Sequence, residues 1–143
     1  MDELPDRIAR TQLTVGVVAV IVGLLGYWVS RDAAFSAGPG AIIFEDVELR
    51  TTSYNRLGAL LTIGFGAMGI VAGTTRMAML GLIGGVGFGL LALQPLLQWR
   101  SGTENLLAAS GRNIGWSLAM ALGLAVPALL ARAITARSDK IDT

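Results

Sequence analysis

The chain has 143 residues, of which 53% are hydrophobic and only 15% charged, and its net charge is +1. A soluble domain carries about 25% charged residues, so this composition indicates a chain whose solvent is mostly lipid. The small net charge argues against a nucleic-acid partner, which needs a strong basic patch. The sequence has no Cys and no His, which excludes disulfides and metal sites built on thiolate or imidazole ligands. We therefore predict no metal and no cofactor.

Four charge-free stretches, each about the length of a bilayer crossing, dominate the sequence. They are residues 11–30, 57–75, 77–99 and 113–131, and arginine stands at nearly every edge. A helix rises about 1.5 Å per residue, so roughly 20 apolar residues cross a hydrocarbon core of about 30 Å. The sequence thus predicts an all-α integral membrane protein with four transmembrane helices in a single domain, 1–143.

The connections between these stretches differ greatly in length. Residues 31–56 form the long extramembrane loop, in which Asp46–Arg50 alternates polar and apolar residues as a short strand does. The preceding segment Ala41–Phe44 could instead lie in the headgroup layer, and the sequence does not decide between a strand and an interfacial segment. Only Thr74-Thr75-Arg76 interrupts the apolar run between the second and third stretches. We expect a tight antiparallel hairpin there.

Basic residues give a weak indication of orientation. Lys and Arg mark the cytoplasmic side. With the N-terminus inside, six lie on that side and five on the other. The first apolar run is long for a signal peptide and three more stretches follow, so we expect a retained first helix. Because Arg7 and Arg10 precede it and the tail is basic, we expect both termini in the cytoplasm, in the plasma membrane of a prokaryote. Aromatic residues that favour the headgroup layer all fall on the side of the long loop: Tyr27, Trp28, Tyr54, Trp99 and Trp116.

Glycine is unusually frequent in the predicted helices: 15 of the 19 glycines lie in the four stretches. In lipid, small residues let helix backbones approach closely. Gly81, Gly85 and Gly89 recur every four residues, so we expect one close helix contact along that face. The residues predicted to pack helices together or to meet a partner chain are Gly69, Gly73, Gly81, Gly85, Gly89, Gly115, Ala119 and Gly123.

The glycine run 81–89 beside an arginine-containing hairpin resembles one feature of rotary ATPase ring subunits. Those rings need a carboxylate in the partner helix, whereas residues 57–75 contain no Asp or Glu. This function is excluded.

No charged residue lies in any predicted span, which argues against a proton-coupled transporter or pump. We expect a small, non-catalytic accessory or structural subunit of a larger membrane complex. Its partners would be the lipid bilayer and other membrane chains or copies of itself. A respiratory-chain assembly is one conceivable host, although no residue selects it.

Two alternatives have their own candidate residues. A passive pore or a carrier for a lipid-like or small apolar molecule would need a cavity faced by polar side chains of the third and fourth helices. These are Gln94, Gln98, Asn113 and Ser117. An enzyme acting on lipids would need Glu104 with Arg100 and Arg112. The acidic residues of the long loop are expected to form a solvated surface rather than a metal site: Glu45, Asp46 and Glu48.

Overall fold

Four α-helices build the part of the chain that the computed structural model describes, namely residues 3–36, 41–42, 53–101, 106–107 and 109–141. The helices are α1 (Glu3–Val29), α2 (Arg56–Thr75), α3 (Ala78–Ser101) and α4 (Gly111–Ile141). Each is long and apolar enough to cross a membrane. The predicted fold is therefore confirmed, and the chain is an integral membrane protein.

The helices continue past the charge-free stretches, most of all near the two chain ends. α1 begins at Glu3 with Pro5 in its first turn, where the missing N–H of proline has no helical partner to lose. α4 has 31 residues, which corresponds to about 46 Å, against about 30 Å for the hydrocarbon core. The last turns of α4, with Arg132 and Arg137, therefore extend beyond the hydrocarbon.

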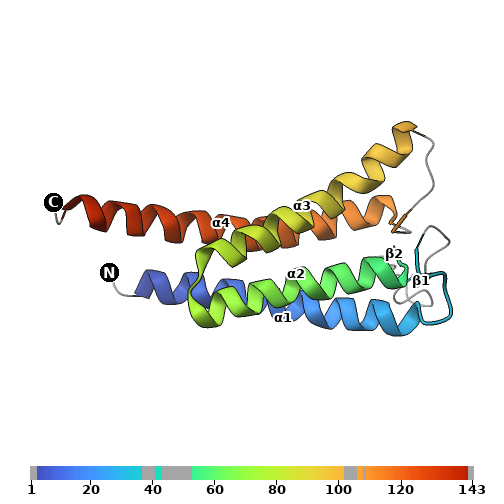
Figure 1. Ribbon diagram of the computed structural model, residues 1–143, viewed down its shortest axis with the longest axis horizontal. Coiled ribbons are helices and arrows are strands. Elements are labelled where there is room, and N and C mark those ends of the chain that lie inside the picture. The colour runs from blue at the N-terminus through green and yellow to red at the C-terminus, as the bar shows by residue number, and fades with distance from the viewer. Residues whose placement is uncertain (1–2, 37–40, 43–52, 102–105, 108, 142–143) are drawn as a thin grey trace.

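The helices run antiparallel, so both termini lie at one end of the molecule together with the α2–α3 turn (Figure 1). We call this the terminal end, and the opposite end the loop end. At the loop end two short strands, β1 (Ala41–Ile42) and β2 (Ser53–Tyr54), pair antiparallel. The start of the segment 41–44 is thus strand. The strand predicted at Asp46–Arg50 lies outside the described residues.

The α2–α3 turn is as short as the sequence predicts. Arg76 ends α2 in the left-handed conformation, with φ 59° and ψ 23°, and Met77 follows before α3 begins. The two helices then separate, because α3 leaves the other helices toward its C-terminal end (Figure 1). The closely packed pairs are instead α1 with α2 and α3 with α4.

The α1–α2 interface brings two backbones together. A Cβ added to Gly16 would lie 2.5 Å from the backbone nitrogen of Ile70 and 2.6 Å from the carbonyl oxygen of Gly66. A Cβ on Gly73 would lie 2.6 Å from the carbonyl oxygen of Ala9. Distances under 3.0 Å leave no room for a side chain, so glycine is what permits this approach.

Small or polar residues at alternating spacings of three and four build this interface. Such a seven-residue repeat is that of antiparallel and parallel coiled coils. Its buried members on α1 are Gln12, Gly16, Ala19, Gly23 and Gly26, and those on α2 are Ala59, Thr62, Gly66 and Gly69.

The α3–α4 interface combines one backbone contact with large side chains. A Cβ on Gly85 would lie 2.8 Å from the backbone nitrogen of Ala125. Next to it, Phe88 and Leu124 are fully buried. The ring of Phe88 meets that of Phe65 on α2 edge to face, with centroids 5.8 Å apart. These side chains form the core where the two helix pairs meet.

The outer surface of the helices is apolar. Large hydrophobic side chains such as Leu90, Leu97 and Leu122 are exposed over more than 60% of their area. In water so extensive an apolar surface would drive association, whereas in a bilayer it faces lipid chains.

Candidate functional site

The predicted packing residues divide into two groups. Gly69, Gly73, Gly81, Gly85 and Gly123 pack against neighbouring helices. For Gly69 the neighbours are Gly16 and Leu124, and for Gly123 the neighbour is Val15. By contrast, a Cβ on Gly89 or Gly115 would meet nothing within 4 Å, and Ala119 is exposed.

The expected single contact through Gly81, Gly85 and Gly89 therefore breaks after Gly85. Gly85 touches α4, whereas a Cβ on Gly89 would meet nothing within 4 Å, although Phe88 and Ala92 on either side of it are buried. Four-residue spacing aligns the three glycines on one face of α3, but this spacing does not determine over how many turns a neighbouring helix stays close.

The loop end is joined by a buried asparagine, Asn113, in the first turn of α4. Its Oδ1 accepts hydrogen bonds from the backbone N–H of Ser53 and of Ser110, at 3.3 and 3.1 Å. Its Nδ2 donates to the carbonyl oxygen of Ser53 at 2.9 Å. Because its side chain reaches back to Ser110 as in a capping box, Asn113 both starts α4 and connects it to β2.

A second buried asparagine, Asn55, starts α2. Its Oδ1 accepts from the backbone N–H of Gly58 at 2.9 Å, which satisfies an otherwise unpaired donor of the first turn. Its Nδ2 donates to the carbonyl oxygen of Leu106 at 2.7 Å. Next to it, Arg56 donates to the carbonyl oxygen of Ala33 at 3.0 Å. The connections before α2 and before α4 are thus held together by polar side chains.

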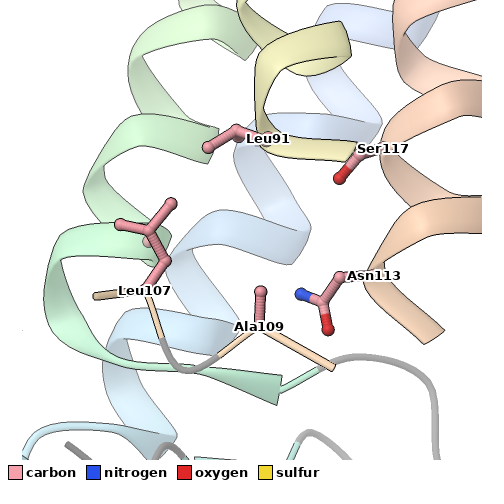
Figure 2. Close-up of a pocket in the computed structure, with 6 residues that line it drawn as sticks. Leu91, Leu107, Ala109, Asn113 and Ser117 are labelled. Carbon is pink, nitrogen blue, oxygen red and sulfur yellow. The ribbon is translucent and has the colours of Figure 1, made fainter. Parts of the chain in front are cut away.

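A cavity of about 10 Å³ lies beside this network, between α2, α3 and α4 (Figure 2). Asn113 and Ser117 line it, as the carrier alternative requires, together with Leu91, Leu107 and Ala109. Its volume is that of about one water molecule. It is too small for a lipid-like molecule.

The other predicted polar residues lie outside this cavity's described lining. Both amide atoms of Gln94 and the Nε1 of Trp116 are buried with no hydrogen-bond partner in the described part of the chain. Gln98 is half-buried. Glu104 lies outside the described residues, and nothing is described of the side chain of Arg100, so the cluster of the lipid-enzyme alternative stays a prediction. The acidic residues Glu45, Asp46 and Glu48 also lie outside them.

Aromatic residues gather at the loop end, where the sequence places them. Tyr27 and Trp28 are exposed at the end of α1, and the guanidinium of Arg31 lies 5.6 Å from the ring of Trp28. Trp116 is half-buried near the start of α4. The side chains of Tyr54 and Trp99 are outside the described part.

The terminal end holds a larger cavity, of about 210 Å³. It lies between the first turns of α1, the Arg76 turn and the last part of α4, with Ala131, Ile134 and Thr135 on its α4 wall. Gln12 also lines it. This side chain is only 2% exposed, and its Nε2 has no hydrogen-bond partner among the described residues.

Sequence reasoning missed Gln12, Asn55 and Ser53. Gln12 could have been found by its position, because it shares the seven-residue repeat with Ala19 and Gly26 in an otherwise apolar stretch. Asn55 precedes a charge-free stretch and is a favoured helix N-cap residue. No sequence signal identifies Ser53, whose role depends on the strand pairing.

Comparison with known proteins gives no family: no family model, no curated protein and no solved structure matches the chain. The functional proposal therefore depends on the geometry alone.

Proposed function

We propose that the chain is a non-catalytic accessory or structural subunit of a membrane complex. It would work by helix–helix contact with other membrane chains or with copies of itself. The observation that supports this is an outward row of small residues on α4, formed by Gly111, Gly115 and Ala119. All three are exposed, and a Cβ on either glycine would meet nothing within 4 Å. In lipid such a row lets a second helix approach closely.

The interior supports the same proposal. Backbone contacts at Gly16 and Gly85 and the side chain of Phe88 fill the middle of the described helices. The two cavities lie at opposite ends of the bundle. A passage for a substrate would have to connect these two cavities through the filled middle of the bundle.

The test compares Gly115 with Gly64, because a Cβ on either glycine would meet nothing within 4 Å. Gly115→Leu should abolish stoichiometric co-purification of a partner chain, or self-association, in mild detergent, and should leave the unfolding temperature unchanged. Gly64→Leu, on α2, adds the same side chain at another position with no neighbour within 4 Å and should change neither. If wild type is a lone monomer, or if both variants keep their partners, the proposal is wrong.

The carrier for a lipid-like molecule remains the second candidate, because the terminal-end cavity of about 210 Å³ is large enough for part of such a ligand. A carrier should accelerate transfer of a fluorescent lipid between vesicles. A contact subunit should not.

We further propose that both termini face the cytoplasm, in the plasma membrane of a prokaryote. Because the chain has no cysteine, Glu3→Cys, Ala34→Cys and Ala136→Cys each provide a single label site. An impermeant thiol reagent added to intact cells should label only the cysteine at Ala34. If only the Glu3→Cys and Ala136→Cys variants were labelled, the orientation would be the opposite of the one proposed.

A further inference from the structure

Gln12, one of the residues that line the terminal-end cavity, carries an unsatisfied polar group. Gln12 reaches from α1 to the backbone of Gly81 on α3, and Ala128 of α4 lies beside the same position. Its Nε2 lacks a partner within the described residues. A buried amide without a hydrogen bond costs about 1–3 kcal/mol. A ligand with a polar acceptor in the cavity would remove this cost once the carboxamide turns from Gly81 toward it.

The cavity lies at the level where the hydrocarbon ends. On α1 the charge-free stretch starts after Arg10, and on α4 it ends before Arg132. Gln12 and Ala131, which both line the cavity, are therefore just inside the boundary, whereas Arg76 lines it from the boundary itself. In a bilayer the interfacial region borders the hydrocarbon at this depth, and it contains the ester and phosphate groups of phospholipids.

The opening carries one charge of each sign. Arg76, which lines the cavity, donates to Oδ1 of Asp6 at 2.6 Å. Both side chains are more than half exposed, so each can also bind a ligand group. A guanidinium binds phosphate well, and a carboxylate binds an ammonium group. The pair itself has no net charge, and its carboxylate offers a partner to the ammonium group of a zwitterionic headgroup that an anionic headgroup cannot use.

We propose that this cavity binds one zwitterionic glycerophospholipid from the bilayer. Its phosphate would bind Arg76, its ammonium group would bind Asp6, and an ester carbonyl would accept a hydrogen bond from the carboxamide of Gln12. A cavity of about 150 Å³ holds a benzene molecule. About 210 Å³ therefore accommodates the glycerol esters and the first methylene groups, while the acyl chains remain in the bilayer.

Native mass spectrometry of the full chain in detergent tests this proposal. The probes are phosphatidylethanolamine, phosphatidylglycerol and glycerophosphoethanolamine, which is the same headgroup without acyl chains. We expect one bound phosphatidylethanolamine per chain and weaker binding of the other two. Gln12→Met, which keeps the volume and removes the amide, should weaken that binding about tenfold, the equivalent of one hydrogen bond of about 1.4 kcal/mol. Asp6→Asn, which removes the carboxylate assigned to the ammonium group, should remove the preference between the two lipids.

The control is Gln94→Met, which removes a carboxamide that also lacks a described partner but lies on α3, outside the described lining of this cavity. It should leave lipid binding unchanged. If Gln12→Met does not fold, Ala131→Leu tests the same cavity from α4 by filling it and should also displace the lipid. Unchanged binding in the folded Gln12 variant, or in Ala131→Leu, overturns the proposal. Equal loss in the Gln94 control also overturns it, and tight binding of glycerophosphoethanolamine would indicate a soluble headgroup ligand instead.

Discussion

The α1–α2 and α3–α4 interfaces use the same residue type with different results. In the first, glycines on both helices meet backbone along most of the pair, as Gly16 and Gly73 illustrate. In the second, the close contact at Gly85 is not continued at Gly89. The difference does not lie in the size of the facing residues. α4 also presents small residues, with Ala121 and Ala125 at Gly85 and Ala128 at Gly81, yet nothing lies within 4 Å of a Cβ on Gly89. Small residues on both helices permit a close contact, but its length depends on how far the two helices stay together, and α3 leaves the other helices toward its C-terminal end (Figure 1).

The largest effect should come from disrupting the α1–α2 interface at its closest point. Gly16→Leu places a branched side chain where even a Cβ would lie 2.5 Å from the backbone of α2. Because backbone cannot move aside as a flexible side chain can, we expect a loss at or above the upper end of the roughly 1–3 kcal/mol typical of overpacking. The measurement is the unfolding temperature in detergent.

Gly64→Leu is the matched control for this variant, because Gly64 lies on α2 with open space around it. It should unfold at the wild-type temperature or slightly above, since leucine is the better helix former. Equal stability of the Gly16 and Gly64 variants would contradict the backbone contact.

A moderate effect should distinguish the two glycines of α3. Gly85→Leu should lower stability by about 1–3 kcal/mol, because the new side chain would press on Ala121 and Ala125. Gly89→Leu should be nearly silent in the isolated chain. A large destabilisation by Gly89→Leu would mean that α3 and α4 remain in contact farther along than described.

The smallest effect should come from the loop end, where polar contacts replace glycine packing. Asn55→Ala removes the α2 cap and should cost about 1–2 kcal/mol, again measured as the unfolding temperature. Asn55→Ser keeps an oxygen that can accept from Gly58 but loses the bond to Leu106, so it should fall between wild type and Asn55→Ala. If serine were as harmful as alanine, the Leu106 bond would matter more than the cap.

The helices could be predicted from the sequence because long charge-free runs have a single stable form in lipid. The helix ends could not, since Glu3–Arg10 and the residues after Arg132 are polar and their helical state depends on the continuation of α1 and α4. The interface glycines of α1 were missed for a similar reason. Gly16 and Gly23 are seven residues apart, and a search at four-residue spacing passes over them.

The candidate site was predictable only in part. Asn113 and Ser117 do line a cavity together, but its size depends on how α3 tilts, which no local pattern specifies. Gln12 is buried because Gly81 of α3 and Ala128 of α4, both distant in the sequence, lie next to it. Contacts of this kind appear only when the helices are placed against one another.

The two-residue turn at Arg76 and Met77 also determines which residues of α3 face inward. Each residue added to a helix rotates the rest of that helix by about 100°. A single insertion at this turn would carry Gly85 from Ala125 around toward the lipid and bring another side chain of α3 to α4. The rotational setting of α3 against both of its neighbours is thus determined at one position, where a left-handed backbone conformation ends α2.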